Sequence, residues 1–309
     1  MKLLPFEKPI EILLKERKRW IEYGKDTKDL DELIKKQVKE IYNNLTAYQI
    51  VQVARHIERP QPEDYINALF DSFMELHGDR VSGEEPALGT GIGFFKGAPV
   101  MLIFNRKGHT TIENLKYHSG MSGPAGFRKA ARVVRLASET LKIPIVTLID
   151  TPGALISHKS ELKGQVAAIY QSMSAFINAN VPILSVITGE GGSLGALGIG
   201  ISDRLLMMEY AYFAVISPEA ASAVLFKNTN NKEFIADELG ITAERLTALN
   251  IVDGIIEEPI GGAHRFKEEA IKNMEKTLEK ELDFLKKEPV SDLKKKRFER
   301  FRNIGVYSI

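Results

Sequence analysis

The sequence contains no cysteine among its 309 residues. That absence excludes a disulfide framework, a thiolate zinc site, an iron–sulfur cluster and a cysteine nucleophile. A zinc ion would need histidine and carboxylate ligands, and the six histidines show no spacing of the zincin type. We therefore assign no metal to this chain.

The sequence also lacks long hydrophobic runs and an excess of charge of either sign. No segment approaches the roughly 18 consecutive apolar residues of a membrane span. The N-terminal segment is interrupted by Glu7, Lys8 and Glu11, unlike a signal peptide. The 42 Lys and Arg residues balance 41 Asp and Glu residues, which gives no electrostatic footprint for nucleic acid. We expect a cytoplasmic protein that binds neither a membrane nor nucleic acid.

Three compositional zones divide the chain. Residues 1–60 are charged and carry apolar residues at the steps of one helix face, which predicts a helical N-terminal extension. Residues 61–262 hold most of the glycine and the strand-like segments, and residues 263–309 return to charged, helical spacing. We expect a core at 61–262 between two helical regions. The N-terminal helices must pack on another surface, either of this chain or of a partner.

Strand and helix patterns alternate in the core. Nearly continuous apolar runs predict strands at 98–104, 143–150, 181–188, 204–209, 212–217 and 251–256. Apolar stripes predict helices at 127–142 and 161–179, and another at 267–287. This alternation indicates the α/β class.

The densest signal is a glycine-rich segment at 181–203. An apolar strand leads into six glycines, which are Gly189, Gly191, Gly192, Gly195, Gly198 and Gly200. Glycine lets the chain turn sharply and lets a ligand approach the main chain, and the helix that follows offers unpaired N–H groups at its start. We expect Ser193 to be the N-cap of that helix. These features suit stabilisation of an oxyanion, although close packing of a helix on a sheet would use the same glycines.

Three motif interpretations of this segment compete. The dinucleotide fingerprint requires glycine at position 194, where the sequence has leucine, and no Gly-Lys-Ser/Thr follows for a P-loop. The third motif, G-x-S-x-G at 191–195, matches the nucleophile elbow of a serine hydrolase. The chain order Ser193, Asp253, His264 would fit the triad of that fold. A hydrolase therefore stays open as an alternative from another reaction class.

Two further segments contribute candidate groups. The turn Asp150-Thr151-Pro152-Gly153 follows a predicted strand, and ligands of open α/β sheets bind beyond the carboxyl ends of strands. This turn and the glycine-rich one could therefore line one crevice, with Asp150 either a general base or a builder of the turn. Segment 106–130 carries several cations, Lys107 among them, which would meet a phosphate or a carboxylate or simply face solvent.

Ten sequence blocks occur in the order of one family. They are FEKPIEIL, LTAYQIVQVARHIERPQPEDYI, FMELHGDR, RKGHTTIEN, GPAGFRKAARVVRLA, PIVTLIDTPGA, GEGGSLGALGIG, YFAVISPEAASAVLFK, IVDGIIEEPIGGAHR and RFERFRNIG. On these blocks the chain resembles the carboxyltransferase alpha subunit of bacterial acetyl-coenzyme A carboxylase, over essentially its whole length.

The resemblance implies a fold, a reaction and partners. The fold is the crotonase-like (ClpP/crotonase) superhelix of ββα units, with an added helical N-terminal region. The reaction moves a carboxyl group from biotin, held on a carrier protein, to acetyl-coenzyme A, and gives malonyl-coenzyme A for fatty acid biosynthesis. The partners are a homologous beta subunit with a zinc ribbon, in an α2β2 heterotetramer, the biotin carboxyl carrier protein and biotin carboxylase. The alpha chain is active only with the beta subunit.

The resemblance also implies site residues, and none of them is a side-chain nucleophile. Main-chain N–H groups of Leu194 and Gly195, with Gly191 and Gly192, correspond to an oxyanion hole for charge on the ureido oxygen of biotin. The substrate-binding residues that it implies are Gly153, Ala154, Leu155, Lys107, Ser217 and Glu219.

The chain departs from the family pattern at several of these positions. Leu194 stands where the family has glycine, the segment 155–157 replaces Tyr-Pro-Gly, and Arg106 replaces glutamine. The changes fall on blocks expected to line the site. Two hypotheses follow: a housekeeping subunit with an unusual site, or a paralogue that acts on another acyl thioester in a dedicated biosynthetic pathway.

Overall fold

The centre of the protein is a mixed β-sheet in a computed structural model, of which residues 2–305 are described. The strands run in the order β1-β2-β3-β4-β5-β6-β8, and β7 pairs with β5 outside this path. Their bounds are β1 Asp71–Glu75, β2 Leu88–Phe95, β3 Ala98–Asn105, β4 Ile145–Thr151, β5 Ile183–Gly192, β6 Arg204–Met208, β7 Tyr212–Ala214 and β8 Gly254–Ile256.

The sheet is antiparallel at one edge and parallel through its centre. Strands β1, β2 and β3 pair antiparallel, and every later pairing from β3–β4 to β6–β8 is parallel. Strands β4 and β5 are buried along their whole length, because helices cover both faces. Parallel pairing brings the carboxyl ends of β4 and β5 to the same edge of the sheet. The turn at 151–153 follows β4 there, and the glycine-rich turn at 189–195 lies at the end of β5.

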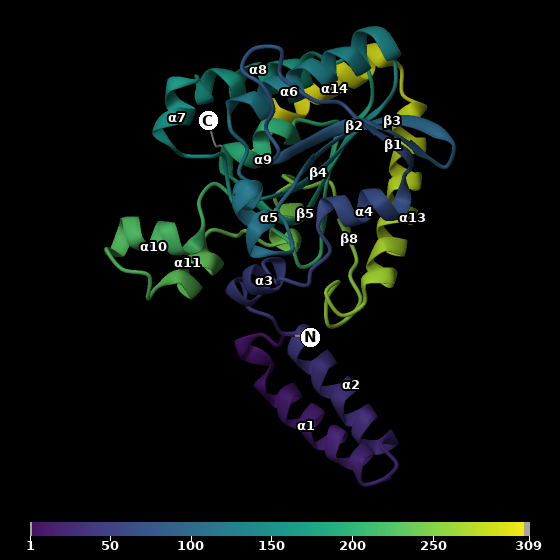
Figure 1. Ribbon diagram of the computed structural model, residues 1–309, viewed down its shortest axis with the longest axis vertical. Helices are drawn as coiled ribbons and strands as arrows, with labels where there is room; N and C mark the ends of the chain where they lie inside the picture. The colour runs from purple at the N-terminus through teal and green to yellow at the C-terminus, as the bar shows by residue number, and fades with distance from the viewer. Residues whose placement is uncertain (1, 306–309) are drawn as a thin grey trace.

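Helices cover the sheet on both faces (Figure 1). On one side lie α6 (Pro124–Arg135), α8 (Gln165–Asn178), α9 (Ser193–Gly200) and α14 (Val290–Arg302), and on the other α3 (Ala47–Ala54), α4 (Pro62–Leu69) and α13 (Lys267–Lys286). The shorter helices are α5 (Thr111–Lys116), α7 (His158–Leu162), α10 (Pro218–Phe226), α11 (Lys232–Glu238) and α12 (Ala243–Ala248). Among residues 2–305, no helix combines the length and the apolar character needed to cross a membrane.

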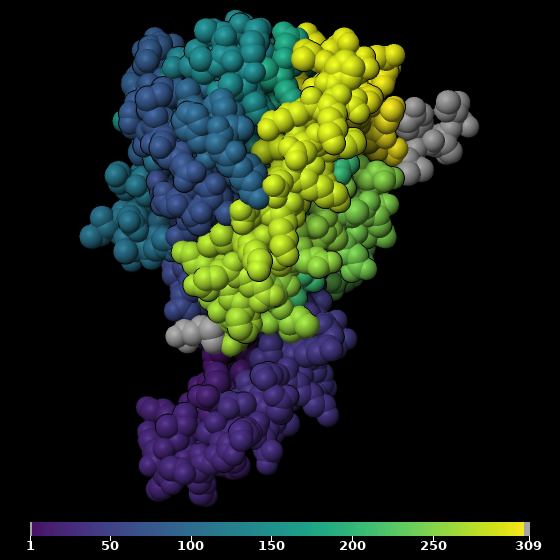
Figure 2. All heavy atoms as spheres, turned by 90° about the vertical axis from the view of Figure 1, so that its right-hand side faces the viewer, coloured from purple at the N-terminus to yellow at the C-terminus, as the bar shows by residue number. Residues whose placement is uncertain are grey.

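The N-terminal helices α1 (Lys8–Glu22) and α2 (Lys28–Tyr42) form a hairpin that projects from the body (Figures 1 and 2). One buried carboxylate anchors its base: Glu7 accepts hydrogen bonds from the Tyr42 hydroxyl, at 2.8 Å, and from the Arg265 guanidinium. Figure 2 shows α13 and α14 running over the adjacent side of the body. The hairpin therefore packs mainly on itself and contacts the body at its base.

Several elements differ from the sequence predictions. Strands β1 and β2 were not predicted, since β2 reads LGTGIGFF and its glycines interrupt the apolar run. The single helix predicted at 161–179 is two helices, because Gly164 takes a left-handed conformation (φ +74°) between α7 and α8. Strand β7 ends at Ala214, well before 217, because Ser217 already caps α10.

Candidate active site

Two turns meet at the carboxyl ends of β4 and β5. A Cβ atom added to Gly192 would lie 2.1 Å from the Pro152 carbonyl oxygen, and one added to Gly195 would lie 2.2 Å from the Gly153 carbonyl carbon. No side chain fits at either glycine, so the main chains of the two turns are in direct contact. The structure thus brings together Gly153 and Gly195, which the sequence had placed in separate motifs.

Helix α9 starts at this contact. Its N-cap is Gly192 and its first residue is Ser193, which has a left-handed backbone (φ +48°) and makes no side-chain capping bond. The prediction that Ser193 is the N-cap is therefore wrong. The Pro152 carbonyl fills the space beside residue 192, so the N-cap position itself carries no side chain that could accept a bond.

The first N–H groups of α9 are the candidate oxyanion donors. The first four N–H groups of an α-helix have no acceptor within the helix, and the helix dipole adds partial positive charge there. Leu194 and Gly195 supply two of these groups, and the Leu194 side chain is 43% exposed. The resulting centre has the hydrogen-bond donors for a developing negative charge and is open to solvent on the Leu194 side.

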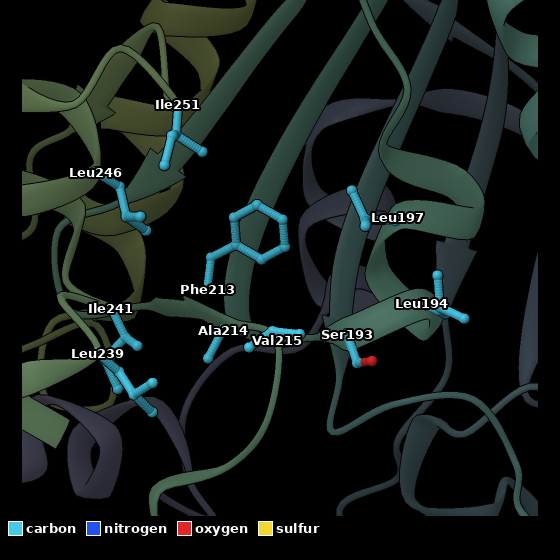
Figure 3. Close-up of a pocket in the computed structure, with 10 residues that line it drawn as sticks. All are labelled: Ser193, Leu194, Leu197, Phe213, Ala214, Val215, Leu239, Ile241, Leu246 and Ile251. Carbon is cyan, nitrogen blue, oxygen red and sulfur yellow. The ribbon is translucent and has the colours of Figure 1, made fainter. Parts of the chain in front are cut away.

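An apolar pocket of about 270 Å³ adjoins the start of α9 (Figure 3). Ser193, Leu194 and Leu197 line it from α9, and Ile241, Leu246 and Ile251 face them from the segment that follows α11. Phe213 and Val215, from β7 and the residue just beyond it, complete the lining between the two sides. The pocket offers apolar surface directly beside the candidate donors.

A buried network of charges lies immediately before the glycine-rich turn. Glu190 accepts bonds from Arg55 Nε (2.6 Å), Lys107 Nζ (2.5 Å) and the Tyr212 hydroxyl (2.7 Å), and Lys107 also contacts Asp150 at 3.0 Å. Burial alone would raise the pKa of Glu190, but the charges of Lys107 and Arg55 outweigh it and bring the pKa to about 2. The carboxylate is therefore ionised at neutral pH.

The family model described as acetyl co-enzyme A carboxylase carboxyltransferase-like matches residues 3–305. The chain belongs to this family. It is 40% identical to the acetyl-coenzyme A carboxylase carboxyl transferase subunit alpha of Methylococcus capsulatus, over 99% of the chain and 98% of that protein. The subunit of the same name from Carboxydothermus hydrogenoformans is 42% identical, with 98% and 96% covered. The resemblance read from the ten sequence blocks is confirmed.

Solved structures support the crotonase-like fold expected of this family. The beta subunit of geranyl-CoA carboxylase from P. aeruginosa superposes with a TM-score of 0.59 at 18% identity, covering 80% of the chain and 46% of that structure. A chain of the Pseudomonas malonate decarboxylase hetero-tetramer gives 0.58 at 15% identity, covering 71% and 88%. The transcarboxylase 12S gives 0.56 at 22% identity, covering 74% and 44%.

The other residues that the family resemblance implied are placed as follows. Lys107 lies in the buried network described above, and Glu219 accepts bonds from Arg55 (2.7 Å) and from the Tyr48 hydroxyl (2.9 Å). Ser217 caps α10 by accepting the Ala220 N–H. These three side chains therefore have partners within the chain, whereas Gly153, Ala154 and Leu155 form the turn that touches α9.

The residues that depart from the family pattern divide into two groups. Leu194 lies at the meeting of the two turns and lines the apolar pocket, whereas Leu155 lies two residues beyond the Gly153 contact and its N–H donates to the Ser122 carbonyl at 3.0 Å. Arg106 instead donates hydrogen bonds from two guanidinium nitrogens, at 2.6 and 3.0 Å, to the carboxylate of Glu75 on strand β1. Its replacement of glutamine is thus explained by a pairing with the sheet edge.

The serine hydrolase triad is not assembled. Asp253 accepts bonds from Arg300 and from the Leu205 N–H, and neither ring nitrogen of His264 has a hydrogen-bond partner. His264 instead stacks on His56 with ring centroids 4.1 Å apart, and burial lowers its pKa to about 2. Neither predicted partner therefore hydrogen-bonds to Ser193, and the predicted triad of Ser193, Asp253 and His264 is wrong. Among residues 2–305 no group of three or more potential ligands could hold a metal.

Sequence reasoning missed Arg55, Glu190 and Tyr212 as members of the site. Glu190 carried a usable signal, since a charged residue after a continuous apolar strand must find a partner when the strand is buried. Arg55 carried a weaker signal, at the end of a helix whose sequence is mostly apolar. The sequence does not show that Arg55 pairs with Glu190, because the pairing depends on α3 lying beside β5 in the fold.

Proposed function

We propose that this chain is the alpha subunit of an acetyl-CoA carboxylase carboxyltransferase, and that it moves a carboxyl group from biotin on a carrier protein to acetyl-CoA. The observation that carries the proposal is the contact between the two turns, which holds the N–H groups of Leu194 and Gly195 against the turn at Gly153 and Ala154. The relatives from Methylococcus and Carboxydothermus bear the name of the same subunit.

The residues present fit a biotin ring with its ureido oxygen. When bound, carboxybiotin supplies the carboxyl group and leaves negative charge on that oxygen. The N–H groups of Leu194 and Gly195 would stabilise the charge, as oxyanion holes do. The apolar pocket beside Leu194 would take the hydrophobic part of the ring. In this arrangement the main chain, and no side-chain nucleophile, performs the chemistry.

The partner of this chain would be a homologous beta subunit, in an α2β2 assembly, which carries the zinc ribbon and most of the coenzyme A site. Support comes from exposed apolar side chains on three helices: Leu162, Val166 and Tyr170 on α7 and α8, and Val224 and Leu225 on α10. Apolar side chains exposed to water do not stabilise a monomer, and large exposed apolar patches mark interaction sites. A biotin carboxyl carrier protein and biotin carboxylase would supply the carboxyl donor in the cytoplasm.

The test is reconstitution with the beta subunit encoded in the same genome. We expect no malonyl-CoA from the isolated chain and carboxyl transfer from the co-purified complex, because the site is only half built here. A panel of short acyl thioesters then separates the two hypotheses about substrate. Preference for acetyl-CoA supports the housekeeping subunit, and preference for another thioester supports the paralogue. Full activity of the isolated chain would contradict the proposal.

A further inference from the structure

One arginine joins three elements around the glycine-rich turn. Arg55, the C-cap residue of α3, donates to Glu190 at the end of β5 (2.6 Å), to Glu219 in the first turn of α10 (2.7 Å) and to the Tyr212 hydroxyl in β7 (2.9 Å). A planar guanidinium holds several acceptors in fixed directions, which a lysine ammonium does not. Arg55 therefore sets the relative positions of β5, β7 and α10.

The acceptor that matters most for the turn is Glu190. Its carboxylate receives Arg55 and Tyr212 on one oxygen and Lys107 on the other, and only 5% of the side chain is exposed. A buried charge that loses one partner is costly, so Glu190 has little freedom to move. The main chain passes directly from Glu190 through Gly191 and Gly192 into the candidate donors.

The same carboxylate also links the two turns. The Glu190 N–H donates to Asp150 Oδ1 at 3.0 Å, and Lys107 bridges the carboxylates of Asp150 and Glu190. Asp150 immediately precedes the Thr151–Gly153 turn that touches α9. The charges thus bind together the two strand ends from which both turns depart.

We propose that Arg55 is a positioning residue for carboxyl transfer. Through Glu190 it fixes the main-chain N–H groups of Leu194 and Gly195, and through Glu219 it ties them to α10. Arg55 touches no reacting atom in this arrangement. The inference rests on the proposed function, since it assigns a role to Arg55 in that same reaction.

The experiment compares variants in complex with the beta subunit. We expect Arg55→Gln to lower kcat by about tenfold or more while KM for acetyl-CoA stays within about twofold, because small misplacements of catalytic groups cost much rate. Arg55→Lys should recover part of kcat, since it keeps the charge beside Glu190. The matched control is Arg204→Gln, which breaks the ion pair between Arg204 and Glu281 (2.9 Å). Arg204 is the first residue of β6, whereas the candidate site lies at the carboxyl ends of the parallel strands, so kcat should stay unchanged.

Wild-type kcat in Arg55→Gln, or an equal fall of kcat in Arg204→Gln, would show that Arg55 only contributes stability and would overturn the inference. If Arg55→Gln fails to fold, Glu219→Gln decides, because it keeps the pair Arg55–Glu190 and weakens the bonds that Arg55 and Tyr48 donate to α10. A wild-type kcat in Glu219→Gln would then reject the tie to α10. A wild-type complex without activity would instead overturn the proposed function itself.

Discussion

At the scale of single residues, the site depends on two glycines whose missing side chains are replaced by another part of the chain. Gly195 packs against the main chain of Gly153, and Gly192 against the Pro152 carbonyl. The requirement is steric and acts between two turns that are distant in sequence. Neither glycine is explained by a positive φ angle, since both have ordinary backbone conformations.

The variant Gly195→Ala tests this contact. Its Cβ would lie 2.2 Å from the Gly153 carbonyl carbon, so one turn must move away and the donors lose their position. We expect carboxyl transfer by the reconstituted complex to fall by about a hundredfold. The control is Gly200→Ala in the same helix, where the nearest atom is the Ile149 Cδ1 at 3.3 Å. Equal activity of the two variants would contradict the steric argument.

The sequence predicted a site at these glycines but not the packing between the two turns that requires them. The glycine count and the strand before it indicated a close approach to the main chain. The prediction that Ser193 caps the helix was wrong: the N-cap lies one residue earlier, at Gly192, whose missing side chain is required by the Pro152 carbonyl oxygen in the turn after β4. Local pattern cannot reveal a contact across the sheet.

At the scale of elements, α10 is a helix that leaves several apolar side chains exposed and so offers a surface to a partner. It is attached to the body near its first turn, where Arg55 holds Glu219, and its far end carries exposed apolar side chains. Leu225 there is 66% exposed. Ile12 on the projecting hairpin is 68% exposed and gives a competing place for the partner.

Charge substitution distinguishes the two surfaces. We expect Leu225→Asp to prevent co-purification with the beta subunit, because a carboxylate would be buried in an apolar interface. Ile12→Asp, at a residue of nearly equal exposure, should leave the complex intact. Loss of the complex in Ile12→Asp alone would place the interface on the hairpin. Circular dichroism of both variants confirms that the fold is kept.

The elements themselves were predicted best where the pattern was strongest. The buried parallel strands β4 and β5 were found from continuous apolar runs, as expected for strands covered on both faces. The glycine-rich β2 was missed, because its burial comes from Phe104 and Phe73 filling the space above Gly89 and Gly91. That compensation is a property of the packed sheet and leaves no trace in β2 alone.

At the scale of the whole molecule, the buried charges should make stability depend on pH. Lys107 and Arg55 overcome the effect of burial and bring the pKa of Glu190 from 4.5 to about 2. A pKa that is lower in the folded state stabilises the fold above the unfolded pKa, and this contribution disappears as the pH falls from 4.5 to 2.

Urea unfolding of the wild type and Glu190→Gln measures this contribution. At about pH 7 the wild type should be the more stable of the two, and the difference should shrink as the pH falls, because protonated glutamate resembles glutamine. A difference that does not change with pH would show that Glu190 is not held as an ion by its partners. Asp203→Asn, which lies in the separate ion pair with Arg297, serves as the comparison.

The overall architecture was predicted through the family resemblance more than through local patterns. Alternating strands and helices indicated the α/β class, and the resemblance supplied the crotonase-like fold. The projecting hairpin was expected only as helices in need of a surface. Its anchor on Glu7 and Arg265 joins residues at opposite ends of the chain, which no local pattern encodes.

The contact between the two turns has a consequence for drug resistance. An inhibitor that accepts hydrogen bonds from the amides of residues 194 and 195 would engage groups that every amino acid except proline retains. Exchange of a side chain at either position would not remove those bonds, and the glycines that shape the turn leave no room for a substitution. Substitutions that weaken such an inhibitor would have to fall in the lining of the neighbouring apolar pocket, to which Leu194, Leu197 and Phe213 contribute side chains.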